Sequence, residues 1–302
     1  MARDWEQTFR GWSGPSSNAE EAKRDRTEEE IRSALKAYAP LKDRSYKVYV
    51  KGSYKNSTNV KQDSDIDICV ELTEFFRYDR PSDSPNATPE QLGIIPYTGD
   101  YSAAKFKNEV DIALAESFGR TKVARGPIAI KIREAKTTLP ADVVPCVELH
   151  EYYFDTLGHP QYRQGTRIFP DTGDAFDNYP QQQYDQGVIK NSETGKRFKQ
   201  MVRILKRLEN ELVELGKIDE LPSYLMECLV YNVPNDRFGH EKYLQDMRES
   251  VAVIYNSTLA DDKCAKWHEV NNIKWLFHKS QGWTRQQAFG LADAAWKHVG
   301  FV

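Results

Sequence analysis

The chain has few cysteines, and their positions argue against two common architectures. Its 302 residues include four cysteines that lie far apart and form no Cys-x-x-Cys pair: Cys69, Cys146, Cys228 and Cys264. This spacing suits neither a zinc site nor a disulfide framework and is typical of a reducing compartment. The sequence also lacks any apolar run close to the about 18 residues that a membrane span needs, and no apolar stretch follows Met1. We therefore expect a cytoplasmic protein without a signal peptide or a spanning helix.

An excess of one charge is also absent. The 42 basic and 45 acidic side chains leave a net charge of −3, and the six histidines show no ligand spacing. Constitutive binding to duplex nucleic acid is therefore not expected, although a local basic patch stays open. What the chain does have is enough apolar residues, 39%, to bury a large core as one domain or two lobes.

Two carboxylates flank an isoleucine in an apolar stretch, at Asp65 and Asp67. Side chains alternate along an extended strand, so both carboxylates point to one face while Ile66 and Ile68 point to the other. One face therefore offers oxygen ligands to a hard divalent cation. The pattern alone is weak evidence, because exposed strands often carry alternating acids.

A Gly-Ser pair, Gly52-Ser53, stands upstream of these carboxylates, after a predicted strand at 48–50 and at the start of a short helix. Its backbone N–H groups and hydroxyl can bind an anion, and the start of a helix adds favourable partial charge. Metal-binding carboxylates combined with a phosphate cradle are what phosphoryl transfer needs.

A third acid, Asp142, lies inside the otherwise apolar stretch 141–147, which predicts another strand. Burying a lone carboxylate is costly unless it meets a cation or hydrogen-bond donors. Two interpretations remain open at this point. Asp142 is a third metal ligand beside Asp65 and Asp67 on an adjacent strand, or it faces solvent on an edge strand near Pro145.

The rest of the chain divides into a mixed α/β part and a helical part. Periodicity and breakers predict helices at 17–38, 100–119, 194–215, 222–231, 241–256, 262–279 and 284–297, a strand at 128–132 and a loop or lid at 75–100. The change of pattern predicts two domains, an α/β (α+β) catalytic core with an N-terminal helix at 1–180 and an α-helical lobe at 181–302.

Two of these helices have clear apolar faces. The inward residues expected in 100–119 are Phe106, Val110, Ile112 or Ala113, Leu114 and Phe118; those in 194–215 are Phe198, Val202, Leu205, Leu208, Leu212 and Leu215. Beside the second face, Lys199, Arg203 and Lys206 recur at helical spacing and predict one basic stripe that could neutralise a triphosphate. The alternative is a solvated face balanced by Glu209 and Glu211.

Taken together, six segments resemble the bacterial cGAS/DncV-like nucleotidyltransferases, which belong to the superfamily of DNA polymerase beta. The segments are G-S-Y-K-N-S-T (52–58), D-S-D-I-D-I (63–68), A-D-V-V-P-C (141–146), N-Y-P (178–180), K-N-S-E-T-G-K-R-F-K (190–199) and P-S-Y-L-M-E-C-L-V-Y-N-V-P (222–234). The resemblance covers roughly residues 15–300. Within the family it is greatest to the E-type enzymes that make cyclic dinucleotides in anti-phage CBASS operons.

The resemblance implies a polymerase-beta-like lobe joined to a helical lobe, with the active site between them. It also implies a role for each matching residue. Two Mg²⁺ ions, for which Mn²⁺ can substitute, would be held by Asp65, Asp67 and Asp142. The donor triphosphate would be bound by Gly52, Ser53, Lys199 and Ser223, while Tyr224 would stack on a nucleobase and Asn178 would read uracil. One departure is Lys51, where many members have Gln.

The implied activity is the condensation of two NTPs, ATP and UTP, into cyclic UMP–AMP or cyclic di-UMP, a second messenger for a downstream effector that senses cyclic nucleotides. Two alternatives remain: a transferase that makes linear oligonucleotides or modifies RNA or small-molecule ends, and a catalytically silent nucleotide-binding scaffold. The residues leave open the exact bases, the 3′–5′ or 2′–5′ linkage, the need for a phage-derived activator and the oligomeric state.

Overall fold

The computed structural model describes residues 3–60 and 65–301, which form two compact units. The sheet unit comprises Asn18–Lys51 and Asp65–Pro180, and the helical unit comprises Met1–Ser17, Gly52–Ser64 and Gln181–Val302. The first 17 residues and the Gly-Ser segment thus group with the helices, whereas the division predicted at residue 180 places them with the sheet. That division into domains stays a prediction.

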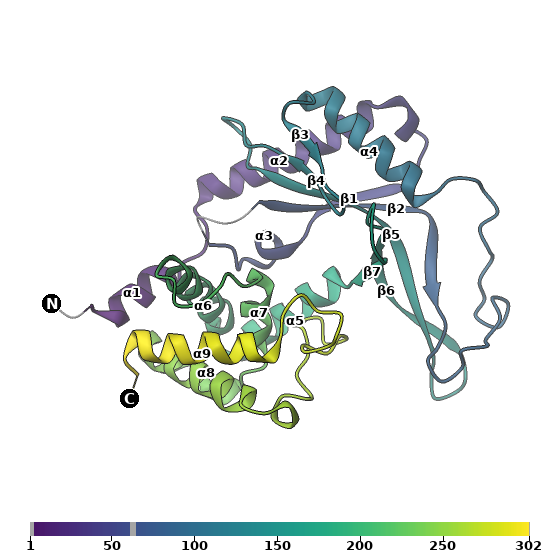
Figure 1. The fold of residues 1–302 in the computed structure, drawn as a ribbon. Coiled ribbons are helices and arrows are strands. Elements are labelled where there is room, and N and C mark those ends of the chain that lie inside the picture. Colours follow the sequence, from purple (N-terminus) through teal and green to yellow (C-terminus); the bar gives the residue numbers. More distant parts are fainter. Residues whose placement is uncertain (1–2, 61–64, 302) are drawn as a thin grey trace. The chain divides into compact units, whose positions relative to one another are not determined.

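The described part of the sheet unit contains a seven-stranded mixed sheet (Figure 1). Its strands are β1 (Tyr46–Val50), β2 (Ile66–Asp79), β3 (Val123–Arg125), β4 (Ile130–Ile132), β5 (Ala141–Phe154), β6 (Pro160–Ile168) and β7 (Phe176–Asn178). The order is β1-β2-β5-β4-β3, and β6 pairs with the later part of β5 and with β7. Only the central pair, β2 and β5, is parallel among these pairings. The predicted fold class is confirmed.

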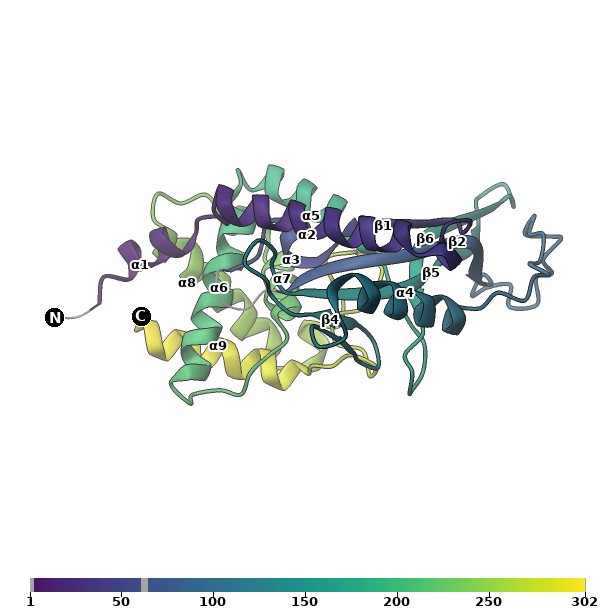
Figure 2. The same cartoon turned by 90° about the horizontal axis from the view of Figure 1, so that it is seen from above.

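Two helices, α2 (Asn18–Ala37) and α4 (Ala103–Phe118), lie side by side over one face of this sheet (Figures 1 and 2), and a short 3-10 helix, η1 (Ala39–Leu41), follows α2. Of the two alternatives in α4, Ala113 is buried and Ile112 is 40% exposed. Phe118 is only half-buried because it is the last helical residue.

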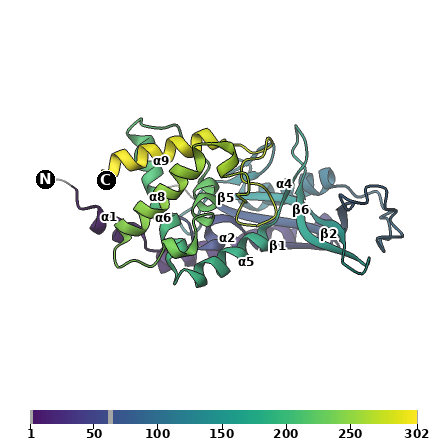
Figure 3. The ribbon, with the colours of Figure 1, turned by 90° about the horizontal axis from the view of Figure 1, so that it is seen from below.

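The helical unit is built from seven helices in its described residues. They are α1 (Trp5–Trp12), α3 (Gly52–Asn56), α5 (Pro180–Glu193, whose first residue belongs to the sheet unit), α6 (Arg197–Glu214), α7 (Ser223–Tyr231), α8 (Tyr243–Thr258) and α9 (Arg285–Val299), with 3-10 turns η2 (Asn235–Arg237) and η3 (Asp261–Lys263). Helices α8 and α9 run side by side (Figure 3). The predicted inward residues of α6 are buried except Leu215, which follows the helix and is 55% exposed. The sequence analysis does not predict helix α1, although Phe9 of this helix is fully buried in the hydrophobic core of the helical unit.

The structure corrects two predicted elements. The helix at 262–279 is wrong: the Asn271 side chain accepts hydrogen bonds from the N–H groups of Ile273 and Lys274, and Asn272 has a φ of 55°, so a turn interrupts the segment. The loop predicted from residue 75 begins later, because β2 continues to Asp79 along β5.

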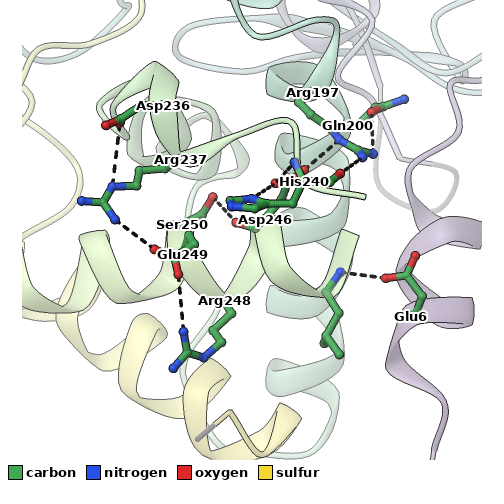
Figure 4. A network of polar contacts seen from close by, with 11 residues as sticks. Glu6, Arg197, Gln200, Asp236, Arg237, His240, Asp246, Arg248, Glu249 and Ser250 are labelled. Carbon is green, nitrogen blue, oxygen red and sulfur yellow. Dashed lines mark hydrogen bonds and ion pairs between the residues drawn. The ribbon is translucent and has the colours of Figure 1, made fainter. Parts of the chain in front are cut away.

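One buried carboxylate ties several parts of the helical unit together (Figure 4). Asp246 on α8 is fully buried; its Oδ2 lies 2.7 Å from Arg197 Nε of α6, and its Oδ1 lies 2.7 Å from His240 Nδ1. Arg197 also donates a 2.6 Å hydrogen bond to the His240 carbonyl. The ion pair therefore fixes the start of α6 against α8 and the turn before it.

Within the described residues, no helix is both long and apolar enough to cross a bilayer.

Candidate active site

The sheet places two of the three predicted carboxylates on neighbouring strands, and the third comes just before one of them. Asp67 of β2 stands directly opposite Asp142 of β5 in the parallel register, and Asp65 immediately precedes β2. Because β5 lies between β2 and β4, the interpretation of Asp142 as an edge-strand residue is wrong. Residues 63 and 64 of the D-S-D-I-D-I segment lie outside the described residues.

Asp142 is the carboxylate whose surroundings are clearest. Its side chain is 25% exposed, its Oδ1 is buried without a hydrogen-bond partner, and Lys131 Nζ lies 3.9 Å from that oxygen. Burial raises the pKa of Asp142 above its usual value, the Lys131 charge opposes this, and the Asp65 charge raises the pKa further. Lys51 lowers it. A buried oxygen that lacks a hydrogen-bond partner and stands near like charge is one that a cation would stabilise.

These oxygens fit a hard divalent cation. However, no three His, Cys, Asp or Glu side chains in the described ranges are grouped closely enough to form a ready-made metal site. The assignment of Asp65, Asp67 and Asp142 as metal ligands therefore stays a prediction.

The raised pKa of Asp142 leads to a test without turnover. A carboxyl whose pKa is higher in the folded chain lowers stability as the pH rises from the unfolded value, about 3.9, through the folded one. With a chelator present, Asp142→Asn should therefore raise the melting temperature at pH 7 more than at pH 4. Saturating Mg²⁺ should reduce the difference in melting temperature between Asp142→Asn and the wild type at pH 7, because bound metal stabilises the wild type more. Thermal unfolding followed by circular dichroism measures the melting temperatures of the variant and the wild type. An equal difference between them at pH 4 and pH 7 would contradict the raised pKa of Asp142.

The Gly-Ser pair opens α3 in the helical unit. Gly52 has a φ of 65°, a conformation that favours glycine, and Ser53 is half-buried. The Ser53 carbonyl accepts a 2.9 Å hydrogen bond from Thr58 N–H, which closes the helix after a single turn. The predicted strand, Gly-Ser turn and short helix are thus confirmed.

The other predicted phosphate-binding residues lie at the starts of two helices of the same unit. Lys199, half-buried on the first turn of α6, has its Nζ 5.9 Å from the Tyr184 ring, which Lys55 of α3 approaches to 4.8 Å. Burial lowers the pKa of Lys199, whereas the Glu227 charge raises it. Ser223, the first residue of α7, is exposed.

Tyr224 follows on α7. Its hydroxyl donates a 3.4 Å hydrogen bond to Glu269 Oε2, and its ring meets the Trp283 ring edge to face at a centroid distance of 6.1 Å. Burial raises the pKa of Tyr224 well above its usual value.

The predicted basic stripe is wrong as a single exposed face. Arg203 and Lys206 are buried, with 5% and 3% of their surface exposed, so a solvated face is wrong for them too. Arg203 donates hydrogen bonds to the carbonyls of Ser13 at 2.7 Å and Ser57 at 2.5 Å. Arg203 thus stabilises the backbone at Ser13 and Ser57. Of the three residues, only Lys199 remains a candidate for phosphate binding.

Asn178 lies on β7 of the sheet unit, opposite Thr166 of β6. It is half-buried, and its carboxamide has no hydrogen-bond partner among the described residues. Both the donor and the acceptor of the amide are therefore available to a base.

Sequence reasoning missed one residue near these candidates, Glu227 on α7. Its carboxylate is 2% exposed and accepts hydrogen bonds from Asn56, Thr58 and Gln183. The available signal was a lone acid in the apolar helix Ser223–Tyr231, the argument that selected Asp142.

Two family descriptions match the chain and define its class. "Nucleotidyltransferase domain" matches residues 28–157, and "cGAS/DncV-like nucleotidyltransferase C-terminal helical domain" matches residues 185–300. The fold is thus that of a nucleotidyltransferase.

The relatives identify the family. The chain is 38% identical over 99% of both chains to a cyclic dipyrimidine nucleotide synthase CdnE from Legionella pneumophila, and 33% identical over 98% of both to a cyclic dipurine nucleotide synthase from Elizabethkingia meningoseptica. A structure of the CdnE c-UMP-AMP synthase from Rhodothermus marinus with Apcpp and Upnpp matches with a TM-score of 0.83 and 28% identity, covering 98% of this chain and 97% of that one. The chain belongs to the cGAS/DncV-like nucleotidyltransferase family.

Proposed function

We propose that this enzyme condenses two NTPs into a cyclic dinucleotide that contains uridine. The observation that carries the proposal is the parallel register of Asp67 and Asp142 in a chain that matches a cyclic dipyrimidine synthase over nearly its whole length. In anti-phage defence, this product would act as a second messenger read by a separate effector, as the resemblance to the CBASS enzymes suggests.

The carboxylates supply the chemistry at the donor α-phosphorus. Asp65, Asp67 and Asp142 would hold divalent cations, for which Mg²⁺ is the first choice, and these would offset charge on the triphosphate and promote ionisation of the acceptor hydroxyl. Asp142 would accept the proton of the acceptor ribose hydroxyl. The hydroxyl oxygen then bonds to the α-phosphorus, and pyrophosphate leaves in line. A second attack of the same kind closes the ring.

The helical unit supplies the contacts that bind the donor. Gly52 and Ser53 bind the triphosphate through backbone N–H groups and hydroxyl, and Lys199 and Ser223 contact the same phosphates. Tyr224 stacks on a nucleobase, which requires its ring to present a face beside its edge contact with Trp283.

The uridine prediction depends on Asn178. The three relatives named above carry dipyrimidine, dipurine and UMP–AMP products in their names, so overall identity alone does not select the bases. The free carboxamide of Asn178 supports pairing with a uracil edge.

The decisive experiment labels one NTP at a time. Purified protein is incubated with Mg²⁺, or Mn²⁺ in parallel, and all four NTPs, with a single α-³²P label in each reaction. Products are treated with phosphatase and separated by chromatography. We expect a phosphatase-resistant product labelled from UTP, and a lower share of UTP label in Asn178→Ala. Label from purines alone would contradict the role of Asn178. Phosphatase would reduce a linear dinucleotide to a dinucleoside monophosphate with one phosphodiester, which chromatography separates from a cyclic product with two, and that species would favour the linear alternative.

A further inference from the structure

The short helix α3 ends in a strained turn. Ser57 has a φ of 55°, in the left-handed region that is unfavourable for a residue other than glycine. Its N–H donates to the Tyr54 carbonyl at 3.4 Å, and Thr58 N–H donates to the Ser53 carbonyl at 2.9 Å. This pair of bonds is a Schellman motif, in which glycine normally occupies the position of Ser57.

Two buried charged residues form hydrogen bonds with three consecutive residues of this turn, Asn56, Ser57 and Thr58. Glu227 of α7 accepts hydrogen bonds from Asn56 Nδ2 at 3.2 Å and from Thr58 Oγ1 at 2.8 Å, on either side of Ser57. Arg203 of α6 donates to the Ser57 carbonyl itself at 2.5 Å. Both side chains are at least 95% buried, so these bonds form away from solvent, where leaving one partner unpaired is costly.

The same two residues are also one helical turn from the predicted phosphate ligands. Arg203 follows Lys199 by four positions on α6, and Glu227 follows Ser223 by four on α7, so each pair shares a helix face. Because α3 is a single turn, the conformation of its end determines where Gly52 and Ser53 stand.

We infer that Glu227 and Arg203 are positioning residues, which hold the Gly52-Ser53 turn in register with Lys199 and Ser223 so that all four can bind one triphosphate. This inference deepens the proposed function and rests on it for the identity of the ligand. Neither residue contacts substrate; each acts through the turn at Asn56–Thr58.

The test compares two buried threonines of the helical unit. Thr58→Val keeps the shape but removes the hydroxyl that Glu227 binds, and Thr58→Ser restores that hydroxyl. Thr258→Val is the matched control: Thr258 is equally buried, and its hydroxyl donates only within α8, to Ile254 at 2.7 Å and Tyr255 at 3.4 Å. Affinity for a non-hydrolysable UTP analogue with Mg²⁺ is measured by calorimetry, beside the melting temperature of each variant.

We expect Thr58→Val to bind the analogue about tenfold more weakly, equivalent to about 1.4 kcal/mol, while Thr58→Ser and Thr258→Val bind like the wild type. Glu227→Gln should lose less, because its amide can still accept from Asn56 and donate to the Thr58 hydroxyl. Should Thr58→Val fail to fold, Arg203→Lys, which releases the carbonyls of Ser13 and Ser57, is expected to weaken binding in the same way.

Two results would overturn the inference: wild-type affinity in the folded Thr58→Val variant, or equal losses in Thr58→Val and Thr258→Val. The labelled-NTP assay separates failure of the positioning inference from failure of the proposed function. A wild type that makes no cyclic product but shows the expected order of affinities loses the proposed activity and keeps the positioning role. A wild type that binds no analogue overturns both.

Discussion

Replacing Asp65 and Asp67 together by alanine is expected to slow pyrophosphate release from NTPs at least about a thousandfold. The physical reason is that divalent cations held by these oxygens provide several kcal/mol of charge stabilisation in phosphoryl transfer, and the remaining Asp142 cannot hold them alone. Pyrophosphate release is followed with a coupled phosphate assay in Mg²⁺.

Removal of the Asp65 side chain should not disturb the fold. Asp65 is exposed and its charge raises the pKa of Asp142, so its removal relieves repulsion. The melting temperature of Asp65→Ala without metal should therefore equal or exceed that of the wild type. Asp83→Ala combined with Asp100→Ala removes the same charge as the double variant, from exposed loop positions of the sheet unit, and serves as its control. A folded Asp65/Asp67 variant that still releases pyrophosphate at the wild-type rate would end the assignment of these residues.

The largest expected loss of stability comes from Asp246→Ala. The substitution leaves Arg197 without its buried partner and removes the acceptor of both the His240 ring and the His240 N–H (Figure 4). Removing one member of a buried ion pair costs about 3–5 kcal/mol, because the other charge stays buried and unpaired. Urea unfolding at neutral pH measures the change in free energy of unfolding.

The matched control for this prediction is Asp236→Ala. Asp236 is also paired with an arginine, Arg237, at 3.8 Å, but its side chain is 78% exposed. An exposed ion pair contributes only about 0–1 kcal/mol, so the control should unfold close to the wild type. Similar midpoints for Asp236→Ala and Asp246→Ala would show that the buried ion pair does not hold the helical unit together.

Several features of this protein could be predicted because their signals are local. The alternation around Asp65 and Asp67 predicts a strand with both acids on one face, and breakers and caps predict α2, α4 and α9 nearly to their observed ends. A lone acid among apolar residues selects Asp142. Applied consistently, the same argument would also have selected Glu227.

Other features required the tertiary structure because they depend on which segments pack together. Helical spacing places Lys199, Arg203 and Lys206 on neighbouring positions, but it does not reveal that Arg203 is covered and pairs with the backbone of Ser13 and Ser57. Similarly, β2 is longer than its local pattern predicts, because β5 offers hydrogen bonds as far as Glu151.

By itself, the sequence determined the kinds of chemistry available here: oxygen ligands in strands, a Gly-Ser turn that can bind phosphate, and the family to which both belong. Only the tertiary structure decided that Asp67 and Asp142 are neighbours in a parallel register, and that Glu227 and Arg203 hold the turn after Ser53. The physical reason is that local patterns set the direction of a side chain, whereas its partner comes from a distant segment chosen by packing of the whole chain.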